Sequence, residues 1–278
     1  MSWKTGKNVS RERLDKVLVA LKLAESRARA QAMILAGLVC VDGQRADKAG
    51  TPVGPSCEIK IDEGKRWASR GAFKLLKALE TFKISVEGRI CVDIGASTGG
   101  FTDVLLNAGA KKVYAVDVGY GQLLSRLAKD PKVAVIDRTN ARTLTPDHFN
   151  DAIDLVVCDA SFISLRLLLP PIDAILAERG EAMVLIKPQF EAGRQRLGRG
   201  GVVRDPLVHE AVLREVLNFA LQETRLRPAG LSWSPILGPE GNVEFLCRLN
   251  RNATAPIDAA AVVEAAHREL EGGKHPKL

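Results

Sequence analysis

One stretch, residues 89–101, constrains the fold of this chain more than any other. A short apolar run at residues 90–94, bounded by Gly88 and Gly95, predicts a buried strand. The small residues that follow predict a tight turn that leads into a helix from about Thr102. Glycines allow the backbone of such a turn to approach a ligand closely, and the N–H groups at the start of the helix point into the same space. The stretch therefore predicts the first strand of an α/β sheet with a nucleotide-type site.

Two acidic residues near the turn narrow the choice of ligand. Ser97 stands where the dinucleotide fingerprint requires its second glycine, and Asp93 at the end of the strand would repel a pyrophosphate. A carboxylate at that position suits a ligand that carries an ammonium and a sulfonium. Asp117 ends the next predicted strand, about 20 residues after the first glycine, where a carboxylate accepts hydrogen bonds from ribose hydroxyls.

These features together predict S-adenosylmethionine as the cofactor. Asp117 alone would suit a nicotinamide cofactor equally well, and the alternative role of Asp93 is to cap the turn or the helix. The joint spacing of both acids and the glycines favours S-adenosylmethionine. The predicted cofactor-binding residues are Asp93, Gly95, Ser97, Gly99, Phe101, Asp117 and Asn140.

The rest of the chain continues the pattern of strands and helices. Parallel strands are expected at residues 90–94, 112–117, 132–136, 154–159 and 182–186, with two more strands at 231–236 and 243–249. Such alternation predicts right-handed crossovers and ligands at the carboxyl ends of the strands. If the last strand runs antiparallel, its start at Glu244 lies at the same edge as Asp159 and Lys187.

These three polar residues predict proton transfer at that edge. Methyl transfer to a weakly acidic hydroxyl requires loss of the hydroxyl proton, and a lysine accepts a proton only when it is neutral. A free lysine has a pKa of about 10.4, which a second ammonium lowers and carboxylates raise. Lys74 would supply that ammonium if the helix predicted at residues 72–82 returns to this edge. Its apolar stripe is expected to be Phe73, Leu76 and Leu79, and a lysine off such a stripe is usually exposed.

Composition places the chain among ordinary globular proteins. Its 278 residues are 46% hydrophobic, which is enough for one large or two modest domains. No apolar run reaches the length of a membrane span, and the N-terminus lacks the apolar core of a signal peptide, so we expect a cytoplasmic protein without a membrane partner. The five cysteines show no CxxC or Cys/His spacing, which predicts reduced thiols and no metal site.

Positive charge is concentrated in the first 70 residues. They hold 14 Lys and Arg against 8 Asp and Glu, which accounts for +6 of the net charge of +7. Two helices, the second at residues 26–36, and short strands at 38–43 and 57–61 are predicted here, with an Asp-Gly hairpin signal after the first strand. A small basic domain predicts a polyanionic partner, although a merely solvated helix face is the alternative. The basic residues expected on the outer helix faces are Arg11, Arg13, Lys16, Arg27 and Arg29.

Two further segments divide the chain. A polar stretch without periodicity predicts a domain at residues 1–62, a linker at 63–71 and a second domain at 72–278. Residues 191–205 carry Arg194, Arg196 and Arg199 among four glycines. This segment is either a mobile surface loop or a lid that orders when RNA phosphates arrive.

The first domain resembles a known RNA-binding module. Residues 13–18, 26–30 and 37–43 are similar to the alpha-L RNA-binding motif, the domain shared with ribosomal protein S-four and many RNA-modifying enzymes. The resemblance covers about residues 11–61 and implies structured RNA as the partner, recognised largely through backbone shape and charge.

Most of the chain resembles the TlyA family, whose members are called haemolysins or ribosomal RNA 2'-O-methyltransferases. The matching motifs include Asp-Ile-Gly-Ala-Ser-Thr-Gly-Gly-Phe at 93–101 and lie at residues 69–74, 93–101, 115–122, 139–142, 159–164, 187–191, 200–205 and 241–245. The resemblance implies a Rossmann-like, FtsJ-like methyltransferase domain that methylates a ribose 2'-hydroxyl, typically of cytidine, in ribosomal RNA or ribosomal subunits.

The wider FtsJ-like group carries a Lys-Asp-Lys-Glu tetrad, which the matching positions place at Lys74, Asp159, Lys187 and Glu244. In this interpretation Lys187 is the base and Lys74 orients the hydroxyl and perturbs Lys187. Asp159 and Glu244 position the lysines and the nucleotide. Three alternatives stay open: an RNA-binding protein that has kept the fold without turnover, a membrane-lytic protein, and a methyltransferase that acts on a base.

Overall fold

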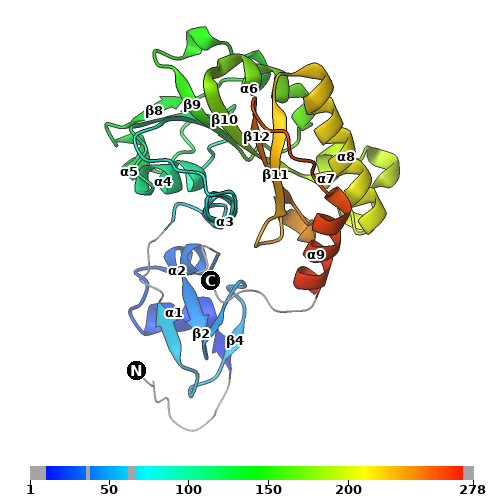
Figure 1. Ribbon diagram of the computed structural model, residues 1–278. Helices are drawn as coiled ribbons and strands as arrows, with labels where there is room; N and C mark the ends of the chain where they lie inside the picture. The colour runs from blue at the N-terminus through cyan, green and yellow to red at the C-terminus, as the bar shows by residue number, and fades with distance from the viewer. Residues whose placement is uncertain (1–10, 36–37, 62–66, 272–278) are drawn as a thin grey trace. The chain divides into compact units, whose positions relative to one another are not determined.

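The computed structural model describes residues 11–35, 38–61 and 67–271, which fall into two compact units (Figure 1). The first unit ends at Arg70 and the second begins at Gly71. The predicted linker at residues 63–71 stays a prediction, because residues 62–66 lie outside the described ranges.

Within its described residues, the first unit contains two helices and two small antiparallel sheets around one apolar core. Its elements are β1 (Glu12–Arg13), α1 (Leu14–Ala20), α2 (Arg27–Leu35), β2 (Val39–Val41), β3 (Gln44–Arg45), β4 (Pro52–Val53) and β5 (Ile59–Ile61). β2 pairs with β3 and β5, and β1 pairs with β4. The predicted Asp-Gly hairpin is confirmed, since Asp42 and Gly43 have φ values of 51° and 77° between β2 and β3.

The second unit is built on a seven-stranded sheet. Its strands are β6 (Ile90–Ile94), β7 (Lys112–Val116), β8 (Val133–Ile136), β9 (Ile153–Cys158), β10 (Leu176–Ile186), β11 (Arg227–Trp233) and β12 (Phe245–Asn250). They lie in the order β11-β12-β10-β9-β6-β7-β8, and β12 runs antiparallel to both of its neighbours while β6 to β10 are parallel. The predicted Rossmann-like α/β fold with a small N-terminal α+β domain is confirmed.

Helices cover both faces of this sheet, with α3 and α4 on one face and α6 and α8 on the other (Figure 1). The helices are α3 (Ala72–Phe82), α4 (Gly100–Asn107), α5 (Ser125–Ala128), α6 (Leu169–Ile175), α7 (Pro188–Glu191), α8 (Pro206–Glu223) and α9 (Ala259–Glu271). Alternate strand residues point to opposite faces, and Val92, Val156 and Val184 belong to the core that α6, α8 and α9 complete.

Two predicted details are wrong. Besides Lys74, the buried residues of α3 are Ala72, Leu75 and Ala78, whereas the expected stripe of larger side chains, Phe73 among them, is only half-buried. Two alanines bring the helix onto the sheet, and a pattern judged from large side chains misses them. β11 also ends earlier than expected, because the Ser234 hydroxyl accepts the N–H of Ile236 and closes a turn there.

Two expectations about the class of protein concern the cysteines and the membrane. All five cysteines are free, as predicted, and three of them are buried. Burial raises the pKa of each buried thiol to about 12, so these thiols stay neutral. None of the helices within the described ranges is both long enough and apolar enough to cross a membrane.

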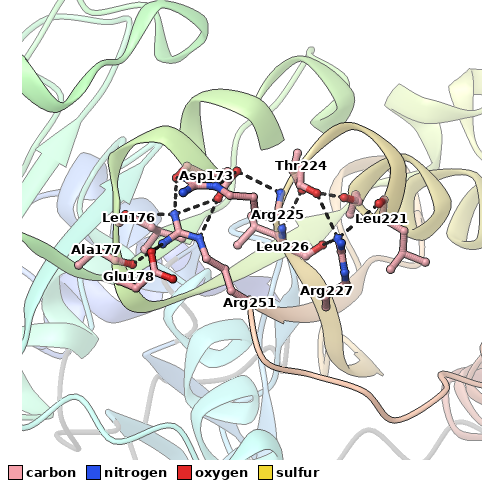
Figure 2. A network of polar contacts seen from close by, with 11 residues as sticks. Asp173, Leu176, Ala177, Glu178, Leu221, Thr224, Arg225, Leu226, Arg227 and Arg251 are labelled. Atoms are coloured by element: carbon pink, nitrogen blue, oxygen red, sulfur yellow. Dashed lines mark hydrogen bonds and ion pairs between the residues drawn. The ribbon is translucent and has the colours of Figure 1, made fainter.

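A polar network centred on Asp173 ties together segments that are distant in sequence (Figure 2). Asp173 in α6 accepts hydrogen bonds from the guanidinium of Arg251 at 2.9 Å and from that of Arg225 at 3.1 Å. Arg251, just after β12, also donates to the carbonyl oxygens of Leu176 and Ala177 at the start of β10. Burial alone would raise the pKa of Asp173, but the hydrogen bonds from Arg225 and Arg251 outweigh it and lower that pKa.

We expect Asp173→Ala to lower the free energy of unfolding by about 3 kcal/mol, which corresponds to a Tm lower by about 6–12 °C. The variant leaves Arg251, whose side chain is 7% exposed, without its buried carboxylate. Glu178→Ala is the matched control, because Glu178 contacts the same arginine at 3.3 Å but is 85% exposed, and we expect a change below about 1 kcal/mol. Thermal unfolding followed by circular dichroism compares the two, and equal shifts would contradict the assignment.

Candidate active site

The sheet changes its direction of growth between β8 and β9, because β9 pairs with β6 rather than with β8. Sheets of this kind bind their ligands outside the carboxyl ends of the strands at such a switch point. Gly95, in the turn after β6, lies close to the segment that follows β9. A Cβ atom at Gly95 would lie 3.2 Å from backbone atoms of Ala160, and the φ of Gly95 is +80°. Glycine is therefore needed for the two loops to meet.

Asp93 is completely buried beside this turn. Its Oδ2 atom accepts hydrogen bonds from the Thr102 N–H at 2.8 Å and the Thr102 hydroxyl at 2.7 Å, so the capping role held open for Asp93 is present. Its Oδ1 atom has no hydrogen-bond partner among the described residues. Burial raises the pKa of Asp93 to about 7; the Thr102 hydrogen bonds oppose this shift, and the charges of Asp159 and Asp117 add to it.

Asp117 organises the other side of the same turn. One carboxylate oxygen accepts the N–H of Ser97 at 2.8 Å, and the other accepts the N–H of Gly119 at 2.7 Å. Gly99, which precedes α4, has a φ of +98°. Asp93, Gly95, Ser97, Gly99 and Asp117 thus lie around one turn.

Two of the predicted cofactor-binding residues, Asn140 and Phe101, have different structural roles. Asn140 is exposed, and its side-chain oxygen accepts the N–H of Arg142, which caps a short 3-10 helix after β8. Phe101 is a core residue of α4 and is only 3% exposed, so its side chain has almost no surface to offer a ligand. The aromatic ring of Phe101 fills space behind the turn.

Four charged side chains meet at the carboxyl edge of the sheet. Lys74 Nζ lies 2.7 Å from Glu244 Oε2 and 3.1 Å from Asp159 Oδ2. Lys187 Nζ lies 2.6 Å from Asp159 Oδ1 and donates to the Ser161 hydroxyl at 2.9 Å. Asp159 therefore bridges the two lysines, and the structure brings together all four residues of the predicted tetrad.

Lys74 is buried, at 7% exposed, contrary to the expectation for a lysine off the apolar stripe of α3. The first turn of α3 places it against the ends of β9 and β12, where two carboxylates face it. Burial is the largest influence and would lower the pKa of Lys74, but the charges of Asp159 and Glu244 together outweigh it and raise that pKa. Lys74 therefore stays an ammonium.

Glu244 reaches this edge because β12 is antiparallel. Its strand begins at Phe245, which is paired with Ile186 at the end of β10, so Glu244 and Lys187 both lie just outside the strands at the same edge of the sheet. Glu244 is fully buried, which allows it to hold Lys74 but leaves no surface for a nucleotide. Gly238 makes room for its carboxylate, since a Cβ atom there would collide with the Glu244 side chain. Among the described residues, no cluster of His, Cys, Asp and Glu side chains forms a potential metal site.

Comparison with known proteins assigns both units. The FtsJ-like methyltransferase family matches residues 67–251, and the S4 domain matches residues 12–59. The 16S/23S rRNA (cytidine-2'-O)-methyltransferase TlyA of Mycobacterium tuberculosis is 44% identical over 265 residues, which cover 95% of this chain and 98% of the relative. The chain belongs to the TlyA family of FtsJ-like methyltransferases. The resemblance indicated by the motifs is confirmed.

Two further proteins similar to this chain carry the name hemolysin. Hemolysin A of Brachyspira hyodysenteriae is 41% identical over 235 residues, which cover 84% of this chain and 98% of that protein. The solved structure of a candidate hemolysin from Streptococcus thermophilus has 42% sequence identity and a TM-score of 0.75, and the match covers 96% of this chain and 99% of that one.

An aromatic pair beside the tetrad was not predicted from the sequence. Phe162, three residues after Asp159, is 91% exposed and has a φ of +62°. Its ring centroid lies 5.2 Å from that of Phe190, three residues after Lys187. The signal was available in the sequence, because each phenylalanine follows a tetrad residue by the same short interval.

In the S4 unit, the predicted basic residues divide into two groups. Arg11, Lys16 and Arg29 are exposed. Arg13 and Arg27, each about half exposed, donate to the fully buried carboxylate of Asp15 at 3.0 Å and 2.9 Å. Hydrogen bonds, chiefly from Arg13, hold the pKa of Asp15 far below its usual range. Asp15 thus fixes two guanidinium groups at the junction of α1 and α2.

The basic loop at residues 191–205 is anchored at its far end. Val202 and Val203 are buried, and the Val203 N–H donates to the side chain of Asn242 at 3.0 Å. Arg196 forms an ion pair with Glu215 of α8 at 3.0 Å. Arg194 and Arg199 are exposed, and the roles predicted for this loop stay predictions.

We expect Gly95→Ala to lower the free energy of unfolding by about 2–3 kcal/mol, because it adds backbone contact with Ala160 to a strained φ. Gly121→Ala is the matched control, since Gly121 has a φ of +64° but nothing within 4 Å of an added Cβ atom. Its cost should be about 1 kcal/mol, from the backbone conformation alone. Chemical denaturation measures both, and an equal loss would show that the contact with Ala160 is unimportant.

Proposed function

We propose that this chain transfers a methyl group from S-adenosylmethionine to the 2'-hydroxyl of a cytidine in ribosomal RNA. The observation that carries the proposal is the pair of buried lysines that share the Asp159 carboxylate, next to the turn formed by Asp93, Gly95 and Asp117. The reaction requires both groups of residues. The lysines are needed to remove a proton from a weakly acidic hydroxyl, and the turn is needed to hold the cationic methyl donor beside it.

The residues of the turn fit the cofactor. The buried Oδ1 atom of Asp93 is an acceptor in need of a donor, which the cofactor's ammonium supplies. Each oxygen of Asp117 accepts one backbone N–H and keeps a lone pair for a ribose hydroxyl. When bound, S-adenosylmethionine supplies a methyl carbon on a positively charged sulfur, which becomes a neutral thioether as the ribose oxygen takes the methyl group.

Lys187 is the proposed base. In its neutral form, Nζ of Lys187 accepts the proton of the 2'-hydroxyl and hands it on to solvent afterwards. Lys74 faces two carboxylates and keeps its proton, so it acts as a fixed positive charge that steadies the developing oxyanion and Asp159. Of these two carboxylates, Lys187 contacts only that of Asp159. Its contacts with the Ser161 hydroxyl and the carbonyl oxygen of Asp159 are with neutral groups.

Three features support RNA as the substrate. The relatives at 44% identity include an enzyme named for cytidine 2'-O-methylation of ribosomal RNA, and this chain also has the S4 domain. The exposed ring of Phe162, paired with Phe190 next to Lys187, offers a stacking surface for an unstacked base. Arg13 and Arg27, oriented by Asp15, suit backbone phosphates. A ribosomal substrate also implies a cytoplasmic site of action.

The first test is transfer of labelled methyl from S-adenosylmethionine to unmodified ribosomal subunits. We expect Lys187→Met to lower kcat by about 10²–10⁴-fold while cofactor affinity stays within about twofold. Lys77→Met is the matched control, because Lys77 lies one turn along α3 and contacts the ring of Trp233 rather than the tetrad.

The product is identified by nuclease digestion and mass analysis. A 2'-O-methylcytidine that disappears only with Lys187→Met supports the proposal. A methylated base, or no transfer by wild-type protein that binds cofactor, would overturn it in favour of a base methyltransferase or a binding protein.

The raised pKa of Asp93 predicts how cofactor binding depends on pH. Below about pH 7 the buried carboxyl group is protonated, whereas the cationic cofactor favours the carboxylate, so binding must release a proton. We expect affinity to rise by up to about tenfold per pH unit toward pH 7, and then to level off. Calorimetry between about pH 5.5 and 7.5 measures this, where the cofactor's ammonium keeps its charge. Asp93→Asn should bind more weakly at pH 7.5 and show little pH dependence; an unchanged slope would contradict the role of Asp93.

A further inference from the structure

Glu191 joins two loops of the active site without belonging to the tetrad. It ends α7 and is only 4% exposed. One carboxylate oxygen accepts the hydroxyl of Ser164 at 2.6 Å, and the other accepts the N–H of Leu165 at 2.6 Å. Arg166 adds an ion pair at 3.7 Å and donates to the carbonyl oxygen of Glu191. The loop after β9 is thereby tied to the helix after β10.

The same loop is fixed at its other end by the tetrad. Lys187 Nζ donates to the Ser161 hydroxyl at 2.9 Å and to the carbonyl oxygen of Asp159 at 3.2 Å. Residues 161–164 are therefore held at both ends, on one side by Lys187 and on the other by Glu191.

Phe162 lies between these two anchors in a conformation that a bulky residue rarely adopts. Its φ of +62° lies in the left-handed region, which bulky L-residues rarely adopt, and the residue is 91% exposed rather than held by core packing. Such a conformation persists only where the surrounding structure enforces it, and it is found mostly at functional sites. The two anchors flank it directly, at Ser161 and at Ser164.

We propose that Glu191 is a positioning residue that holds the 161–165 loop so that the Phe162 ring, with Phe190, receives the target nucleoside. This inference rests on the proposed function. Because Glu191 is buried, it does not touch the substrate and acts through the loop. A carboxylate suits the task, since it accepts the buried N–H of Leu165 and the hydroxyl of Ser164 at the same time.

Steady-state kinetics with ribosomal subunits tests the role of Glu191. We expect Glu191→Ala to lower kcat/KM for the subunits by about ten- to a hundredfold, with the affinity for S-adenosylmethionine within about twofold of wild type. Glu191→Gln keeps an acceptor for the Leu165 N–H and should recover to within about fivefold of wild type.

The matched control is Asp173→Asn, which weakens another buried carboxylate clamp at a site remote from the tetrad. It should lower Tm and leave kcat/KM unchanged. If Glu191→Ala lowers only Tm, as the control does, the inference is wrong.

A double-mutant cycle with Phe162→Ala separates positioning from general damage. If Glu191 acts through Phe162, the variant with both substitutions should be within about threefold of Phe162→Ala alone. Losses that multiply would overturn the inference while leaving the proposed function intact. Failure of the proposed function has a different signature, because wild-type protein would then transfer no methyl group to the subunits.

Discussion

The Asp159 carboxylate contacts two lysine side chains at once, and the arrangement of the whole active-site edge depends on it. Lys74 comes from α3 and Lys187 follows β10, so the carboxylate after β9 joins three elements. A buried ammonium such as that of Lys74 is tolerable only beside anions, and Glu244 supplies a second carboxylate. Loss of either carboxylate would leave the charge of Lys74 without part of its counterpart.

The turn at Asp93 and Gly95 was predictable because its causes are local. A buried strand, glycines with positive φ and an acid at the strand end occur within a few consecutive residues, and each constrains its neighbours directly. The parallel direction of β6 to β10 was predictable as well, since a chain that alternates strands and helices has few topologies open to it. Asp117 belongs to this class as well, because the end of β7 must lie beside the end of β6.

Lys74 and Phe162 show where reasoning from sequence patterns ends. The burial of Lys74 results from contacts of α3 with β11 and β12, which are formed much later in the chain, and helical periodicity contains no information about them. The sequence pattern left the return of this helix to the edge as a condition, and the family resemblance placed Lys74 in the tetrad. The positive φ of Phe162 has no local signature either, and the contacts that hold its loop at both ends come from Lys187 and Glu191, later in the chain. Asp15 is similar, since its burial turns two expected surface arginines into members of a network.

The position of β12 also has a consequence for synthesis of the chain. Among the strands that the structure describes it is the last to leave the ribosome, yet it lies between β10 and β11, one strand in from the edge of the sheet. The turn with Asp93 and Asp117 is complete long before Glu244 exists. Until β12 is added, Lys74 has only the carboxylate that it shares with Lys187. A growing chain thus contains the residues of the proposed cofactor site before it contains the whole tetrad.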